Sequence, residues 1–174
     1  MDVLISKAEI EARVQQLADE IHRDFDRRPF TVVGVLTGSL VFLADLIRAI
    51  RLPHRIGLMQ ASSYRGTTLA GTLVVNDSLL TDVMNRDVLL LDDILDTGAT
   101  LSRVVEHLVQ NKGAATVKTA VLLRKIGRQT VPFEPDYVGF TIPNRFVVGY
   151  GLDFDDDYRH LPDIIVLPGP HDDE

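Results

Sequence analysis

The sequence predicts an α/β protein with a parallel, doubly wound sheet flanked by helices. The uninterrupted apolar run at 88–91 has the length and aliphatic character of a strand that is buried on both faces. Strand-like and helix-like segments alternate across 30–123, which is typical of a parallel sheet joined by helical crossovers. Between the strand at 88–91 and the helical pattern that follows it stands a short polar turn rich in carboxylates. Ligands of open α/β sheets bind at such strand ends, so we expect the functional site there.

The N-terminal segment shows the pattern of a capped helix. Ser6 and Glu9 have the spacing of a capping box, and apolar residues then recur every three to four positions. This pattern predicts a helix over 7–26. Pro29 closes the connection, and the β-branched residues at 31–35 predict a buried strand.

A turn at 37–39 leads into a second expected helix, which places Leu40, Leu43 and Ile47 on one face and is stopped by Pro53. The polar, Gly- and Thr-containing stretch 62–71 is expected to be a mobile loop. The other expected elements are strands at 56–58, 72–75, 88–91 and 117–123, a helix over 99–111, and short strands near 137–140, 146–149 and 164–167.

Length and composition indicate an ordinary globular chain. The 174 residues, 45% of them hydrophobic, suffice for one domain over 1–174 that buries its own core. We expect a core over about 30–125 and a small hood formed by about 1–28 and 130–168. The absence of cysteine rules out disulfides and thiolate chemistry and fits a cytoplasmic protein.

Charge and hydropathy exclude several classes of partner. A net charge of −7 argues against general nucleic-acid binding, which needs a basic surface. The longest uncharged stretch, 29–44, has 16 residues, fewer than the ~20 that span a membrane. No basic region precedes an apolar segment at the N-terminus, so no signal peptide is expected. We therefore expect neither nucleic acid nor membrane as a partner.

The most informative segment is 88–101, which reads VLLLDDILDTGATL. The adjacent carboxylates of Asp92 and Asp93 can accept hydrogen bonds from sugar hydroxyls. The small-residue turn after them opens a helix, whose free amides and dipole attract a phosphate. A simple N-cap needs one acidic residue, whereas this run has three. The segment therefore predicts a site for a phosphorylated sugar.

This segment closely resembles the phosphoribosyl-pyrophosphate motif of the type I phosphoribosyltransferases, and its ending, Asp-Thr-Gly-x-Thr, resembles the hypoxanthine(-guanine) branch. Matches at 36–46, 62–64 and 135–153 follow that family in order and spacing, and the resemblance extends from about residue 5 to about 168. It implies the type I phosphoribosyltransferase fold and a Mg²⁺-dependent glycosyltransferase of purine salvage. Such an enzyme transfers 5-phosphoribosyl from phosphoribosyl pyrophosphate (PRPP) to hypoxanthine, and also to guanine, and releases pyrophosphate. The resemblance further implies a homodimer or homotetramer.

The resemblance also implies residue roles. Asp96 would be the general base near the purine N7, and a non-proline cis peptide would join Leu36 to Thr37. Many relatives have Lys where this chain has Thr37, and Glu where it has Asp92. The implied sets are PRPP-binding Asp92, Asp93, Thr97, Gly98, Ala99, Thr100, Thr37, Gly38 and Arg159; flexible-loop Ser63 and Tyr64; purine-binding Lys125, Phe146, Val147 and Asp153; and metal-binding Asp92, Asp93 and Asp153.

Structural interpretations of several of these residues stay open. Asp96 could be a helix N-cap, Lys125 a surface residue, Phe146 a core residue, and Arg159 a salt-bridge partner of the acids at 155–157. Two other functions are also open. One is the same chemistry on xanthine, adenine or uracil, and the other is a regulator that senses PRPP while binding RNA or DNA.

Overall fold

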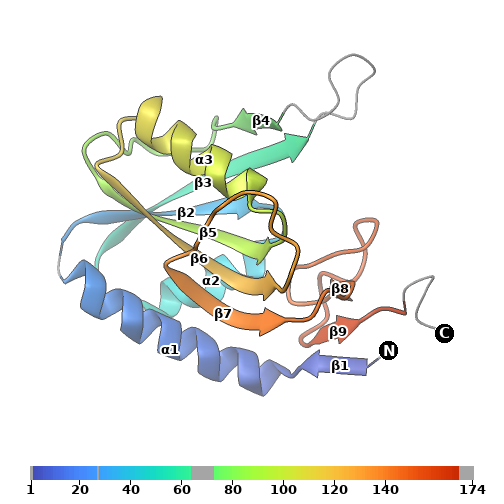
Figure 1. Cartoon of the computed structure of the whole chain (residues 1–174). Coiled ribbons are helices and arrows are strands. Elements are labelled where there is room, and N and C mark those ends of the chain that lie inside the picture. The colour runs from blue at the N-terminus through green and yellow to red at the C-terminus, as the bar shows by residue number, and fades with distance from the viewer. Residues whose placement is uncertain (1, 27, 64–72, 169–174) are drawn as a thin grey trace, which may run out of the picture.

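The computed structural model describes residues 2–26, 28–63 and 73–168, and the side chain of Ser63 lies outside that description. Its main sheet has six strands in the order β4-β3-β2-β5-β6-β7 (Figure 1). All neighbours are parallel except β4, which runs antiparallel to β3. This confirms the predicted parallel sheet. Its strands are β2 (Phe30–Leu36), β3 (His54–Ser63), β4 (Leu73–Asn76), β5 (Asp87–Leu95), β6 (Thr116–Lys125) and β7 (Tyr137–Ile142).

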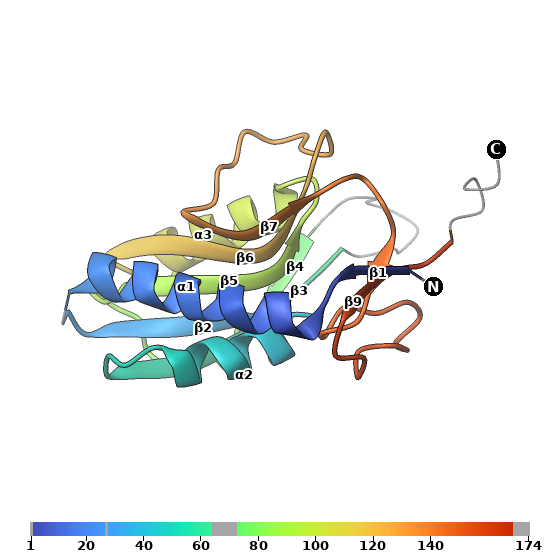
Figure 2. The ribbon, with the colours of Figure 1, turned by 90° about the horizontal axis from the view of Figure 1, so that it is seen from below.

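Helices cover both faces of the main sheet (Figure 2). Helices α1 (Lys7–Phe25) and α2 (Leu40–Ala49) lie on one face and α3 (Ala99–Gln110) on the other. Leu89 and Leu91 of β5 pack in the core beneath α1 and α2, whereas Leu90 packs in the core beneath α3. Burial on both faces explains why this strand reads as a continuous apolar run.

A second, antiparallel sheet lies beyond the carboxyl ends of the parallel strands (Figure 1). It consists of β1 (Asp2–Ile5), β9 (Ile164–Val166) and β8 (Val147–Val148), in that order. The expected hood also contained the first helix and the strand near 137–140. The structure instead packs α1 against the main sheet and makes β7 its edge strand, because both bury apolar side chains in the same core.

Helix α1 begins as predicted, whereas the predicted face of α2 is correct only in part, because Leu43 and Ile47 pack in or against the core but Leu40 is exposed. Ser6 caps α1 with a reciprocal capping box to Glu9. The buried residues of α2 are Phe42, Leu43 and Leu46, and Leu40, at the first position, is 49% exposed. No helix in the described ranges is long and apolar enough to cross a membrane.

Two strands, β3 and β5, extend well beyond their predicted carboxyl ends, which were at residues 58 and 91. Strand β5 continues to Leu95, so Asp92 and Asp93 lie inside the strand and not beyond its end. Strand β3 continues through Ser63, which pairs with Leu73 of β4. The rest of the expected mobile loop, 64–71, lies outside the described residues.

Candidate active site

Two carboxylates from β5 are buried side by side at the carboxyl end of the main sheet. Asp92 is 8% exposed, and its Oδ1 accepts a hydrogen bond from the Asp93 amide at 3.0 Å. Asp93 is partly buried, and its Oδ1 accepts the Ile94 amide at 2.8 Å. Burial, followed by the charge of Asp93, raises the pKa of Asp92 well above its usual value. Burial likewise raises the pKa of Asp93, although the charge of Arg159 opposes this shift. The burial excludes a solvated turn pair.

The turn after β2 contacts these carboxylates. A Cβ placed on Gly38 would lie 1.7 Å from Oδ2 of Asp93, so only glycine lets the two approach so closely. The peptide bond between Leu36 and Thr37 is cis, as predicted. The Thr37 carbonyl accepts the Leu40 amide at 3.1 Å, which closes the turn into α2. The structure thus brings together two sequence segments that are 55 residues apart, 38 and 93.

The segment 149–161, which follows β8, lies against the same turn. Gly151 has a φ of +97°, and a Cβ there would meet the Gly38 carbonyl oxygen at 2.5 Å. Arg159 Nη1 donates to the Gly151 carbonyl at 2.8 Å, and Nη2 pairs with Asp153 at 3.0 Å and Asp156 at 3.2 Å. The salt-bridge interpretation of Arg159 is therefore confirmed for Asp156. The same contacts bring the guanidinium to the predicted pyrophosphate loop.

The N-terminus of α3 forms a small hollow next to these groups. The N-cap residue is Gly98, which has a φ of +86° and no side-chain capping bond. Thr97 Oγ1 accepts the Ala99 amide at 3.3 Å. The first amides of a helix have no partner within the helix, so they are free to bind an anion. The hollow has a volume of about 60 Å³ and is lined by Ile94, Leu95, Asp96, Thr97, Gly98, Thr100 and Leu101.

Asp96 is held by an arginine that the sequence analysis did not identify. Arg128 Nε lies 2.8 Å from Asp96 Oδ1, and Nη2 lies 3.5 Å from Oδ2. Since Gly98 is the N-cap, the interpretation of Asp96 as a cap is wrong. The side chain of Asp96 is 39% exposed and that of Arg128 is 44% exposed, so solvent and small molecules can reach the pair. Because 32 residues separate the two, no local pattern could reveal it.

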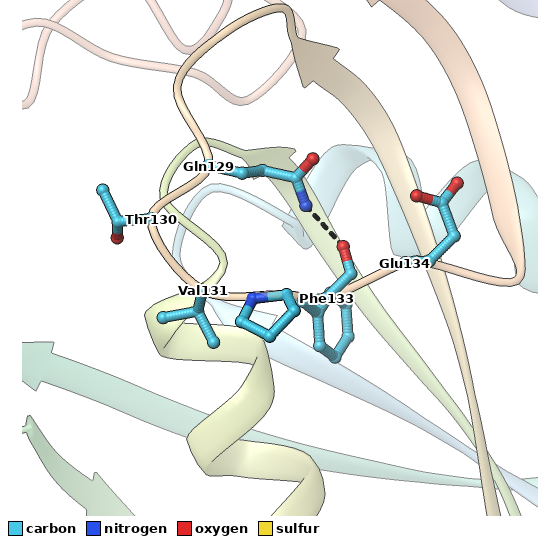
Figure 3. A pocket seen from close by; sticks show the side chains of 6 residues that line it. Gln129, Thr130, Val131, Phe133 and Glu134 are labelled. Carbon is cyan, nitrogen blue, oxygen red and sulfur yellow. Dashed lines mark hydrogen bonds between the residues drawn. The ribbon is translucent and has the colours of Figure 1, made fainter.

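Arg128 belongs to the connection between β6 and β7, which lies beside the start of α3 (Figure 3). The amides of Thr130 and Val131 both donate to the Thr97 carbonyl, at 3.0 and 3.2 Å. This connection also encloses a hollow of about 590 Å³, lined by residues 129–134. None of the predicted site residues lines it, so the smaller hollow at α3 fits the prediction better.

An exposed aromatic pair marks the predicted purine site. Phe146 is 46% exposed, which rules out the interpretation as a core residue. Its ring meets that of Phe154 edge to face, with centroids 5.4 Å apart and an interplanar angle of 86°. Val147 is buried in β8. The sequence analysis missed Phe154, although it is the one aromatic residue among the four acids at 153–157, and that contrast in composition was the available signal.

Some of the predicted site residues make no described contact with the others. Lys125 ends β6, and within the described ranges no hydrogen bond or ion pair links it to another predicted site residue. Tyr64 lies outside the described residues, and only the backbone of Ser63 is described. Among the described side chains, no group of three or more His, Cys, Asp or Glu could by itself enclose a metal ion.

Comparisons with known proteins agree with this geometry. Residues 4–155 match the family model of the phosphoribosyl transferase domain. The chain is 40% identical over 169 residues to the hypoxanthine-guanine phosphoribosyltransferase of Aquifex aeolicus (strain VF5), covering 96% of this chain and 94% of that protein. A crystal structure of a hypoxanthine-guanine phosphoribosyltransferase from Bacillus anthracis has a TM-score of 0.89 and 37% identity, covering 97% and 98% of the two chains.

A third relative is the hypoxanthine phosphoribosyltransferase of Trypanosoma cruzi, with a TM-score of 0.88 and 37% identity over 97% of this chain and 91% of that one. That structure concerns the role of the C-terminal region in its oligomeric state and enzymatic activity. These likenesses confirm the type I phosphoribosyltransferase fold. Together with the match over most of its length, they show that the chain belongs to the phosphoribosyltransferase family.

Proposed function

We propose that this protein is a purine-salvage glycosyltransferase that moves 5-phosphoribosyl from PRPP to hypoxanthine and guanine, giving IMP or GMP and pyrophosphate. The proposal is supported above all by the convergence of Gly38, Asp93 and Gly151 at one point beside the N-terminus of α3. The relatives named above are transferases for the same bases.

PRPP would bind across the three converging segments. The free amides at the start of α3, with Thr97 and Thr100, would receive the 5-phosphate in the hollow of about 60 Å³. Asp92 and Asp93 would accept hydrogen bonds from the ribose hydroxyls. The turn at 37–38 and Arg159 would bind the pyrophosphate. Fixing both ends of the donor would hold the anomeric carbon in line for attack.

The donor set suits Mg²⁺. Magnesium prefers oxygen ligands, and it is usually bound by one or two carboxylates together with waters and substrate phosphates, so a complete protein cage is not required. A cation would relieve the burial of the two adjacent carboxylates Asp92 and Asp93, whose pKa values burial raises. Among the described side chains, Asp153, the third ligand that the resemblance implies, forms no three-acid group with them, so substrate oxygens and water would complete the coordination. When bound, Mg²⁺ would neutralise charge on the leaving pyrophosphate.

The purine base would be bound by a second group of residues, separate from those that would bind PRPP. Phe146 would stack on the purine, the Val147 backbone would hydrogen-bond to it, and the Lys125 ammonium would donate to its 6-oxo group. Asp96 would accept or share the proton from N7 as N9 is alkylated, an effect typically worth about 10²–10⁴-fold. Ser63 and Tyr64 would close over the reaction and exclude water.

We further propose that residues 1–174 form a single folding unit that acts as a homodimer or homotetramer in the cytoplasm. One apolar core contains residues of α1, of the main sheet and of the small sheet, which supports a single unit. The T. cruzi structure concerns the oligomeric state of a relative, which supports looking for an oligomer here. The absence of cysteine suits a reducing compartment.

The test is product formation from PRPP with hypoxanthine, guanine, xanthine, adenine and uracil, with Mg²⁺ or with a chelator. We expect Mg²⁺-dependent turnover of the 6-oxopurines. Asp96→Asn should lower kcat by about 10² or more and leave donor binding unchanged. Turnover of adenine or uracil alone would contradict the assigned bases. Turnover of none of the five would contradict the enzymatic function and favour a PRPP-sensing regulator.

A further inference from the structure

A buried tyrosine links α2 to the segment that carries Arg159. Tyr150 is 6% exposed, and its hydroxyl donates to Oδ2 of Asp45 at 2.7 Å. Burial and the neighbouring Asp45 carboxylate raise the pKa of the Tyr150 phenol far above its usual value. The hydroxyl therefore stays protonated at any working pH, and it remains a hydrogen-bond donor.

The backbone on either side of Tyr150 lies close to the backbone of two other segments of the chain. Tyr150 has a φ of +50°, and its neighbours Gly149 and Gly151 both have a φ of +97°. A Cβ on Gly149 would lie 2.0 Å from the Asp163 carbonyl oxygen, and one on Gly151 would lie 2.5 Å from that of Gly38. Tyr150 thus sits at the centre of a turn that touches the proposed pyrophosphate loop.

The same turn determines where Arg159 lies. The Gly151 amide donates to the Arg159 carbonyl at 3.0 Å, and Arg159 Nη1 donates back to the Gly151 carbonyl at 2.8 Å. The Tyr150 amide donates to the Leu161 carbonyl at 2.8 Å. A shift of the turn would therefore move the guanidinium with it.

Asp45 stands on the element that the pyrophosphate loop leads into. Helix α2 begins at Leu40, directly after the turn at 37–39, and Asp45 lies within it. The bond between Tyr150 and Asp45 consequently ties the loop on one side of the site to Arg159 on the other. Arg48 pairs with the second oxygen of Asp45 at 2.6 Å, so Asp45 keeps a partner if the phenol is removed.

We propose that Tyr150 is a positioning residue for pyrophosphate, whose hydrogen bond to Asp45 holds Arg159 and Asp153 against the turn at 37–38. The inference rests on the proposed function for the identity of the ligand. It assigns to Tyr150 no contact with substrate.

The molecule provides a matched control. Tyr137 is 4% exposed and its hydroxyl donates to Asp24 Oδ2 at 2.6 Å, so it makes the same kind of bond in a similar environment. That bond joins β7 to α1, and neither residue belongs to the proposed site. Tyr137→Phe and Tyr150→Phe should therefore destabilise the fold comparably, but only the second should affect the donor.

The experiment compares steady-state constants of the wild type, Tyr150→Phe and Tyr137→Phe. We expect Tyr150→Phe to raise KM for PRPP about fivefold, equivalent to about 1 kcal/mol, with less than a twofold change in KM for hypoxanthine. Tyr137→Phe should leave both constants unchanged. Asp45→Ala also removes the exposed pair with Arg48, but it should raise KM for PRPP as Tyr150→Phe does, and the double variant should show no further rise, because both changes remove the same hydrogen bond between Tyr150 and Asp45.

Calorimetric titration with Mg²⁺-pyrophosphate provides a readout that does not depend on turnover. Tyr150→Phe should bind pyrophosphate about fivefold more weakly than Tyr137→Phe. Equal affinities of the two variants, or no binding by the wild type, would overturn the positioning role. Failure of the wild type to turn over any purine while this difference persists would overturn only the proposed function.

Discussion

Gly38→Ala should inactivate the site while leaving the fold intact. The added Cβ would lie 1.7 Å from Asp93 Oδ2 and 2.5 Å from Asp93 Cγ. Non-bonded Cβ contacts below 3.0 Å essentially do not occur, so the turn or the carboxylate must move by at least 3.0 − 1.7 = 1.3 Å. Asp93 has little freedom to yield, because its other oxygen accepts the Ile94 amide at 2.8 Å.

The size of the effect follows from this displacement. A misplacement of about 1 Å in a positioned reacting group can cost about 10²-fold in rate. If the Asp93 carboxylate is displaced by that much, kcat/KM for PRPP should fall by about 10²-fold, or about 2.7 kcal/mol of transition-state stabilisation. If the turn moves instead, the loss is the same, since the pyrophosphate loop is then misplaced.

Initial rates at varied PRPP, together with thermal unfolding, test this prediction. Gly113→Ala is the control, because Gly113 has a φ of +69° and an added Cβ would only touch Met84, at 3.5 Å, far along the chain from the site. It should cost about 1 kcal/mol of stability through backbone strain alone. A Gly38→Ala variant whose kcat/KM for PRPP stays within threefold of Gly113→Ala would refute the reasoning.

Three further predictions concern single contacts. Arg128→Gln should lower kcat about threefold to fivefold, because Asp96 loses an exposed ion pair that orients it; an unchanged kcat would show that the pair is incidental. Phe154→Ala should raise KM for hypoxanthine about threefold to tenfold with no change for PRPP, because Phe146 loses its edge-to-face partner; an equal rise for both substrates would argue against this role. Ser6→Ala should lower the free energy of unfolding by about 1 kcal/mol and Tm by about 2–4 °C without affecting kinetics, because it removes the cap of α1.

Short sequence patterns correctly predicted the elements whose formation depends on residues close together in the sequence. The capping box at Ser6 and Glu9 located the start of α1, and the apolar run at 88–91 located the central strand. The buried face of α2 was predicted only in part: Leu43 and Ile47 pack in or against the core as predicted, whereas Leu40, which also satisfies helical spacing, is 49% exposed. Strand β1 was missed because four residues give too little periodicity to recognise.

Contacts between distant segments could not be predicted in the same way. The ion pair of Arg128 with Asp96 and the bond of Tyr150 with Asp45 join residues 32 and 105 positions apart. Neither has a local signature, since an arginine in a turn and a tyrosine between glycines are compatible with many surroundings. The resemblance to a family supplied the candidate site residues, and the structure supplied residues such as Arg128 and Tyr150 that contact them or their segments.

The arrangement of charges leads us to expect that pyrophosphate binding at the proposed site depends strongly on Mg²⁺. Thr37 brings no positive charge to the turn at 37–39, which we propose as the pyrophosphate loop. Arg159, the cation that the structure brings to that loop, already pairs with Asp153 and Asp156 at 3.0 and 3.2 Å. These two pairs compensate part of its charge before a polyanion arrives. Asp92 and Asp93 lie nearby in β5, where burial raises the pKa of both carboxyls. We therefore expect pyrophosphate to bind more tightly with a dication than without one, because a dication between the carboxylates and the ligand would offset the repulsion between like charges.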